Sequence, residues 1–164
     1  MTAVGQRVVR VSAERYAQER LVGNAELRLP GVPAGERVVL VAGTDPPVVF
    51  GLGRAVREGV VRYTRRLFDT PLPADGLVDG PLPAERYAVL VDTAGTGAPV
   101  RTWLVGVDLP VEAESAAEAV RRYWSYLREL GPTELPAYVA PVGDELAMQA
   151  LLVGEPAPLD PEED

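Results

Sequence analysis

No histidine, cysteine, lysine or isoleucine occurs in this chain of 164 residues, and arginine supplies all 16 of its basic side chains. Without cysteine the chain has no disulfide, no thiolate metal site and no thiol nucleophile. Without histidine it has no Ser–His dyad and no imidazole acid–base group. Without lysine it has no Schiff base and no P-loop lysine. These absences exclude most of the common catalytic centres.

Carboxylates and hydroxyl groups are the side chains that remain for catalysis. Asp and Glu act as acids and bases or hold magnesium or calcium, but no calcium-binding loop, G-x-S-x-G elbow or P-loop motif occurs. The sequence therefore predicts a protein that is not an enzyme and that holds no metal or cofactor. A weaker alternative is a carboxylate-based enzyme that uses Asp69, Asp75 or Asp79, which lie in a long proline-rich loop.

Long apolar runs and an N-terminal signal pattern are also missing, which predicts a cytoplasmic protein with no membrane partner. One domain is expected over residues 1–154. The last ten residues, EPAPLDPEED, contain five acids and three prolines, so 155–164 is predicted to be a disordered acidic tail. The net charge of −8 argues against a general nucleic-acid binder, but without the tail 19 acids face 16 arginines.

Strand patterns precede a strong helix pattern. Ser12 is expected to cap a short helix, and Ser115 with Glu118 forms a capping box for a helix ending before Gly131. Because the strands follow one another with few helices between them, the pattern favours an α+β fold, a small, mixed, mostly antiparallel β-barrel with peripheral helices. For 144–153 the pattern fits a helix or a strand equally. The strands are expected at 7–11, 37–41, 48–56, 60–68, 86–92 and 100–109.

Five arginines gather in a short window whose only acid is Glu58, so that residues 54–66 carry a net charge of +4. Guanidinium groups bind phosphate through paired hydrogen bonds. On a regular strand Arg62 and Arg66 share one face and Arg65 points to the other. The alternative is an edge strand that its charges keep from pairing. The five are Arg54, Arg57, Arg62, Arg65 and Arg66.

Aromatic residues lie near the same window. Nucleobases stack on aromatic rings beside arginine, but aromatic residues on strands more often fill a core, and Phe50 is expected to be buried. The glycines of Gly51-Leu52-Gly53 have no helix after them, so they indicate a close backbone approach or a bend, not a dinucleotide site. The aromatic residues are Phe50, Tyr63, Phe68, Tyr87 and Trp103.

The segment GERVVLVAGTDPPVVFGLGRAV, together with the short strand ending at Val11-Ser12, resembles the PUA-like superfamily, in particular its EVE and ASCH branches. The resemblance implies a small barrel that binds RNA or a modified base in a pocket beside the 37–57 hairpin. It implies that Ser12 and the Ala42-Gly43-Thr44 segment line this pocket, with an aromatic cage drawn from Tyr16, Phe50 or Tyr63.

Two classes of function follow. The first is a non-catalytic domain that recognises RNA or a modified nucleotide; its expected binding residues are Arg54, Arg57, Arg62, Tyr63, Ser12 and Thr44. The second is a protein-interaction module or homodimer that uses the 115–130 helix, whose apolar stripe is flanked by Trp124 and Tyr126.

Overall fold

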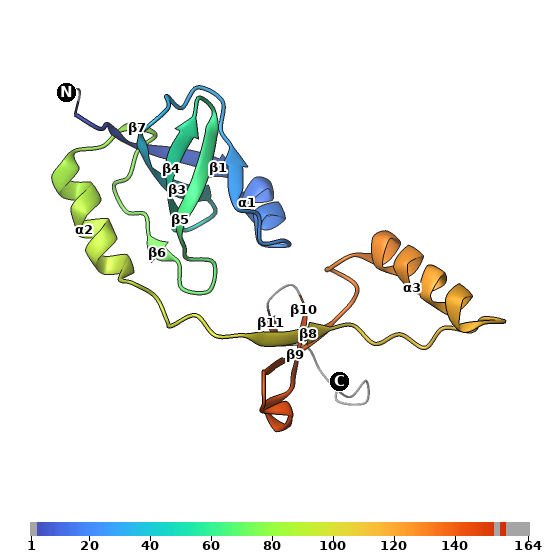
Figure 1. Ribbon diagram of the computed structural model, residues 1–164. Helices are drawn as coiled ribbons and strands as arrows, with labels where there is room; N and C mark the ends of the chain where they lie inside the picture. The colour runs from blue at the N-terminus through green and yellow to red at the C-terminus, as the bar shows by residue number, and fades with distance from the viewer. Residues whose placement is uncertain (1–2, 153–154, 157–164) are drawn as a thin grey trace. The chain divides into compact units, whose positions relative to one another are not determined.

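The computed structural model describes residues 3–152 and 155–156. Its internal contacts divide the chain into two compact units, Met1–Ala98 and Pro99–Asp164 (Figure 1). The chain is α+β with mostly antiparallel sheets, as the sequence predicted. The expected single domain over 1–154 spans both units, which are taken separately below. No helix in the described ranges is long and apolar enough to cross a bilayer.

The first unit is a twisted sheet with one helix on each side. Its strands run in the order β2-β5-β4-β3-β1-β7, with β6 paired to the start of β4. Among the described strands of this unit, only β1 and β3 pair in parallel. Among the described residues this path does not close on itself, so the barrel stays a prediction. The elements are β1 (Gln6–Ser12), α1 (Ala13–Glu19), β2 (Glu26–Arg28), β3 (Arg37–Gly43), β4 (Val48–Arg57), β5 (Val60–Arg66), β6 (Leu72–Pro73), β7 (Gly80–Pro81) and α2 (Ala84–Ala94).

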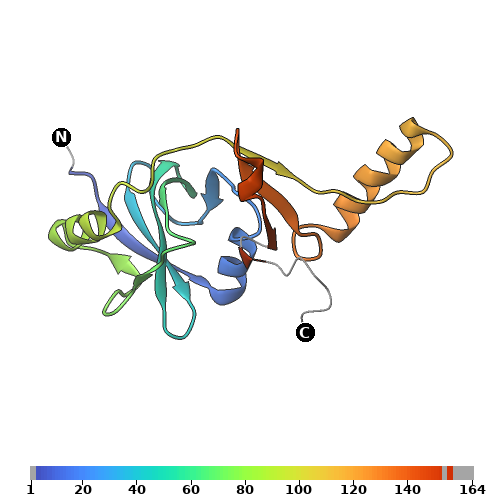
Figure 2. The same cartoon turned by 90° about the horizontal axis from the view of Figure 1, so that it is seen from below.

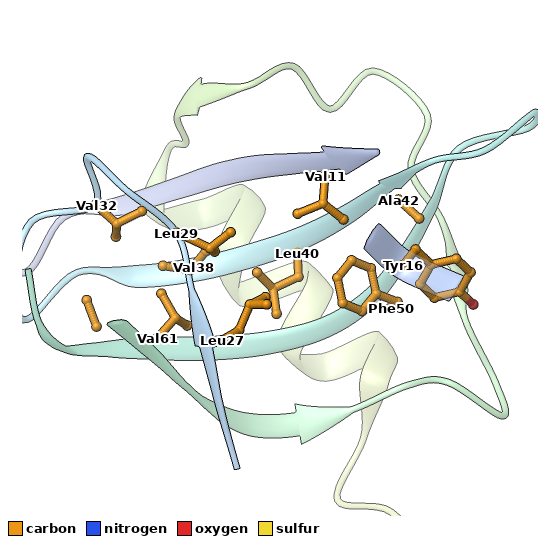
Figure 3. Packing of buried hydrophobic residues seen from close by; sticks show 11 residues of the cluster. Val11, Tyr16, Leu27, Leu29, Val32, Val38, Leu40, Ala42, Phe50 and Val61 are labelled. Carbon is orange, nitrogen blue, oxygen red and sulfur yellow. The ribbon is translucent and has the colours of Figure 1, made fainter. Parts of the chain in front are cut away.

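Strand β3 is apolar on both faces because both faces of the sheet are covered. Val38 and Leu40 point to a cluster that includes Tyr16 of α1 and Phe50 of β4 (Figure 3). Val39 lies in a second cluster on the opposite face, against which side chains of α2 pack. A near-continuous apolar run is what a strand buried on both faces requires. As expected, Phe50 is fully buried.

The expected strand at 86–92 is wrong, because this segment lies inside helix α2. The run Tyr-Ala-Val-Leu-Val favours a strand by propensity. However, Tyr87, Leu90 and Ala94 recur at helical spacing and pack against the second cluster, while Val89 and Val91 are exposed. Burial of that single stripe decides the conformation.

The second unit pairs four strands in the order β11-β10-β9-β8. The helix predicted after Ser115 is confirmed with its cap: the Ser115 hydroxyl accepts from the Glu118 amide. Of the 144–153 segment, residues 144–152 are described, and they form a short 3₁₀ turn followed by a strand. Of the predicted tail, only Glu155–Pro156 is described, as a strand, and 157–164 lies outside the described residues. The elements are β8 (Trp103–Gly106), α3 (Ala116–Leu130), β9 (Ala137–Pro141), η1 (Glu145–Ala147), β10 (Gln149–Leu152) and β11 (Glu155–Pro156).

Candidate functional site

Four aromatic rings form one cluster beneath α1 in the first unit. The ring of Tyr16 lies 5.1 Å from that of Phe50 and 6.1 Å from that of Phe68, and the ring of Tyr63 lies 6.1 Å from that of Phe68. Offset and tilted rings at these distances attract one another beyond their burial alone. Phe50 is fully buried and Tyr16 nearly so, whereas Tyr63 and Phe68 are only partly buried. The cluster therefore has a core side and an accessible side.

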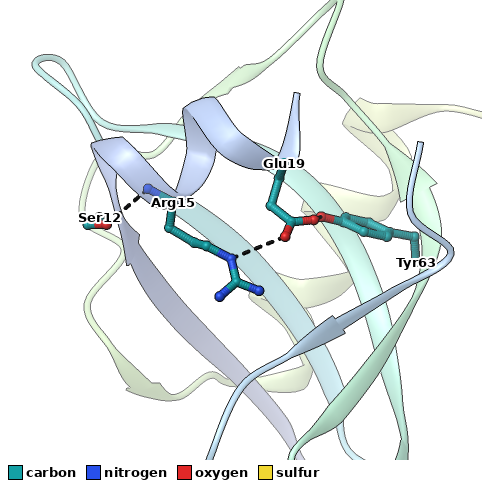
Figure 4. Close-up of polar contacts among 4 residues, drawn as sticks. All are labelled: Ser12, Arg15, Glu19 and Tyr63. Atoms are coloured by element: carbon teal, nitrogen blue, oxygen red, sulfur yellow. Dashed lines mark hydrogen bonds and ion pairs between the residues drawn. The ribbon is translucent and has the colours of Figure 1, made fainter. Parts of the chain in front are cut away.

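Glu19 brings a negative charge to this cluster. Its exposed fraction is 6%, and no other charged side chain in the described ranges is buried. One carboxylate oxygen accepts from Arg15 Nε at 3.1 Å, and the other accepts from the Tyr63 hydroxyl at 3.1 Å (Figure 4). A buried carboxylate is tolerated when such donors satisfy it. Tyr16 and Glu19 lie three residues apart, on the one face of α1 that is buried.

The Tyr63 hydroxyl is held in its neutral form. Burial raises the pKa of Tyr63 well above its ordinary value, and the negative charge of Glu19 raises it further. The phenol therefore donates to Glu19 throughout the physiological pH range.

The two glycines of the G-x-G pair let β5 approach β4 closely, as predicted, and Gly51 makes room for the ring of Tyr63. A Cβ at Gly51 would lie 3.1 Å from Cε1 of the Tyr63 ring. A Cβ at Gly53 would overlap Val61 and lie 2.9 Å from the Arg62 carbonyl oxygen. Larger residues would displace β5 and with it the Tyr63 ring.

Two arginines lie over the tyrosine rings at the accessible side. The guanidinium of Arg20 is 5.7 Å from the centre of the Tyr16 ring, and that of Arg66 is 5.1 Å from the centre of the Tyr63 ring. Both arginines border a cavity of about 250 Å³, here called the α1 cavity. It is lined by Glu19, Arg20, Leu21, Val22, Gly23, Arg66, Phe68 and Asp69. Aromatic, cationic and carboxylate groups thus meet in one small space.

The predicted arginine cluster is divided between two faces of the sheet, and differently from the prediction. The pairing of β4 with β5 shifts between Leu52 and Gly53, which leaves Thr64 as an extra residue. Because of this bulge, Arg62 and Arg65 share one face while Tyr63 and Arg66 share the other. The prediction that Arg62 and Arg66 lie on the same face is therefore wrong.

Arg54 and Arg62 lie opposite each other, and Arg54 also pairs in register with Arg37. These three residues, here called the arginine row, lie on the sheet face away from the α1 cavity. Arg62 forms an ion pair with Glu26 at 2.8 Å. Arg54 borders a separate cavity of about 290 Å³ with Glu36. Arg57 is exposed at the end of β4.

Three other residues of this region serve the fold. The Ser12 hydroxyl accepts from the Arg15 amide at 3.1 Å and so caps α1, as expected. The Thr44 hydroxyl donates to the Pro46 carbonyl at 2.9 Å across the β3–β4 turn. Arg65 donates to the carbonyls of Ala94 and Gly95, at the end of α2. These hydrogen bonds give each residue a structural role without a ligand.

The three aspartates of the proline-rich loop have separate surroundings. Asp69 borders the α1 cavity, whereas Asp75 borders an apolar cavity of about 270 Å³ beside α2. Asp79 accepts from the Arg10 amide at 2.8 Å. Nothing in the described ranges pairs two of these carboxylates, so the geometry gives the carboxylate enzyme no support.

Sequence reasoning missed the roles of Glu19 and Arg20. Both belong to the segment SAERYAQERLV, which was interpreted only as a capped helix. A carboxylate three residues after an aromatic residue on the buried face of a short helix was the available signal.

The acidity of the chain is confined to the second unit. Residues 1–98 contain 12 arginines and 11 acids, a net charge of +1, whereas residues 99–164 contain 4 arginines and 13 acids, a net charge of −9. The whole-chain charge therefore says little about what the first unit binds.

Comparisons of this chain with protein-family models, curated proteins and solved structures found no match. The resemblance to PUA-like domains stays a prediction, and the function is inferred from the side chains themselves.

Proposed function

We propose that the first unit binds RNA or a modified nucleotide, with one unstacked base in the α1 cavity. The observation that carries the proposal is the meeting of Phe68, Arg66 and the Glu19 carboxylate around one cavity. Single-stranded nucleic acids are recognised by stacking of bases on aromatic or guanidinium planes and by hydrogen bonds to base edges. The α1 cavity supplies both kinds of contact.

Each wall of the cavity suits one part of a nucleotide. Phe68 is partly exposed and offers a ring for stacking. The carboxylates of Glu19 and Asp69 accept from the amino or imino groups of a base edge. Arg20 and Arg66 suit a phosphate. A volume of about 250 Å³ lies below the roughly 300–1,000 Å³ of sites for whole drug-sized ligands, so the cavity suits one base rather than a dinucleotide.

The proposal keeps the PUA-like barrel and the RNA-binding role as one hypothesis but moves the site. The expected pocket lay beside the 37–57 hairpin, whereas the α1 cavity lies between the end of α1 and the segment that follows β5. Of the expected binding residues, Tyr63 belongs to this site through Glu19 and Arg66. Arg54 and Arg62 lie on the opposite face and form the competing surface.

Fluorescence anisotropy with short labelled RNA and DNA oligomers, plain and base-modified, at two salt concentrations tests the proposal. We expect saturable binding that weakens with salt, because phosphate contacts release counterions. Arg66→Gln is expected to weaken binding at least about tenfold, the effect of losing a contact of about 1.4 kcal/mol. The matched control is Arg54→Gln, the same change of charge on the other face of the sheet.

Binding lost in Arg54→Gln and Arg62→Gln but kept in Arg66→Gln would place the site on the arginine row and contradict the α1 cavity. Absence of binding at low salt to every oligomer would contradict the nucleic-acid function itself. Phe68→Leu separates stacking from packing, because leucine keeps an apolar side chain but removes the ring.

A further inference from the structure

The apolar stripe of helix α3 in the second unit is covered only in part. Tyr123 and Leu127 are partly buried, but no residue of the helix is fully buried and the exposed fraction of Trp124 is 59%. In Figures 1 and 2, α3 projects away from strands β8 to β10. Its described side-chain links to the rest of the unit include hydrogen bonds from the Tyr123 hydroxyl to the Val107 carbonyl and from Arg122 to the Glu112 carbonyl, both at 2.9 Å. A stripe of this kind is stable in water only when another surface covers it.

The sheet of the same unit offers an apolar surface that is also uncovered. In the described part of this unit only Ala140 and Ala150 are buried hydrophobic residues. Every residue of the edge strand β8 is exposed. One sheet face has a cavity of about 230 Å³, here called the sheet hollow, whose apolar lining includes Leu104, Tyr138 and Met148.

Charges around the two surfaces have opposite signs. On α3, Arg121 and Arg128 lie three residues before and four residues after Trp124, on the same side of the helix. Asp108 and Glu145 line the sheet hollow. Within the described ranges, none of these four side chains forms an ion pair. The helix therefore presents the Trp124 ring between two arginine side chains. The sheet hollow presents apolar side chains beside two carboxylates.

We propose that the second unit dimerises by exchange of α3, so that Trp124 of each copy enters the sheet hollow of the other. Both complementary surfaces are present on one chain, which is what a closed two-fold interface requires. Six exposed apolar side chains on these surfaces, each offering roughly 100 Å², supply on the order of 600 Å² per copy, the lower limit of what a specific interface buries on each side. The six are Leu104, Val120, Trp124, Leu130, Tyr138 and Met148.

Sedimentation velocity of the full chain over micromolar concentrations tests the proposal with two matched pairs of variants. Trp124→Glu and Met148→Glu place one negative charge in the interface. Ser125→Glu lies on the side of α3 opposite its apolar stripe, about 100° around the helix from Trp124. Gln149→Glu lies on the face of the sheet opposite the sheet hollow, so each control adds the same charge away from the proposed contact. We expect a wild-type dimer, kept in both controls. Its dissociation constant should rise at least about tenfold in Trp124→Glu and in Met148→Glu.

A wild-type chain that stays monomeric over this range would overturn the proposal, since α3 would then be covered within its own chain or by another protein. A dimer that survives Trp124→Glu would overturn the role of the helix. A dimer sensitive to Trp124→Glu but not to Met148→Glu would overturn the assignment of the hollow. All four substitutions lie at partly or fully exposed positions, and circular dichroism verifies that each variant keeps its helix.

Discussion

The burial of the Glu19 carboxylate depends on hydrogen bonds from two side chains, and substitution of either one tests it. Two donors from different elements hold it, Arg15 from its own helix and Tyr63 from β5. The cost of burying a charge is offset only while both donors remain. This arrangement couples α1 to the sheet beside the α1 cavity.

Tyr63→Phe removes one donor and leaves the rest of the ring in place. The buried Glu19 oxygen then lacks its partner, so we expect the free energy of unfolding to fall by about 1–3 kcal/mol. Urea denaturation followed by far-UV circular dichroism measures this change. Tyr87→Phe is the control, because that hydroxyl has no hydrogen-bond partner in the described structure, and the expected change is below about 0.5 kcal/mol. Equal losses in the two variants would contradict the coupling.

Because the pKa of Tyr63 is raised, the free energy of unfolding depends on pH in the alkaline range. The folded pKa lies above the unfolded value of about 10, so the unfolded state loses its proton first. The stabilisation is fully present below about pH 10 and is lost as pH rises from there towards the folded pKa. We expect Tyr63→Phe to flatten this decline in urea midpoints. Burial also raises the pKa of Tyr87, so the double variant with Tyr87→Phe should be flatter still. An unchanged slope would contradict the assignment.

At the scale of elements, the close contact between β4 and β5 explains the glycine pair. Gly53→Ala would force its Cβ towards Val61 and the Arg62 carbonyl, and overpacking of this kind costs about 1–3 kcal/mol. The loop glycine Gly23 has open space and an ordinary backbone angle, so Gly23→Ala is the control and should be neutral or slightly stabilising. Thermal unfolding of both variants distinguishes these outcomes. An unchanged melting temperature in Gly53→Ala would mean that β5 shifts away from the new Cβ without loss of stability.

Local patterns predicted most of the elements because their signals lie within a few residues. The cap at Ser12, the cap at Ser115 and the hairpin of β3 with β4 are all of this kind. Helix α2 was missed because its β-branched residues favour a strand, and only burial of its stripe against the sheet decides otherwise. The bulge at Thr64 was missed because register depends on the partner strand, which a single segment does not reveal.

The candidate site was predicted in part for the same reason. Aromatic residues and arginines in one window pointed to Tyr63 and its neighbours, and the Tyr63 hydroxyl donates to Glu19, which lines the α1 cavity. The contribution of Glu19 and Arg20 depends on how α1 packs on the sheet, which no local pattern states. The face on which each arginine lies depends on the bulge.

At the scale of the whole molecule, the two units differ in charge and in burial. The first holds nearly all of the buried apolar side chains and is close to neutral, whereas the second is strongly acidic and buries only two alanines among its described residues. Stability follows buried apolar area. We therefore expect the second unit to be the weaker of the two and to depend on association for its stability.

Intrinsic probes separate the units, because both tryptophans, Trp103 and Trp124, belong to the second. The far-UV circular dichroism signal reports both units, because α1 and α2 contribute 7 and 11 helical residues and α3 contributes 15. In urea, we therefore expect two circular dichroism transitions, with the change in tryptophan fluorescence coinciding with the one at lower urea. The midpoint of this first transition should rise with protein concentration, because dissociation precedes unfolding of an associated unit. The midpoint of the second transition should not depend on protein concentration. Coincident, concentration-independent transitions would instead identify one cooperative domain over 1–154, as the sequence alone predicted, since agreement between probes is the mark of two-state unfolding.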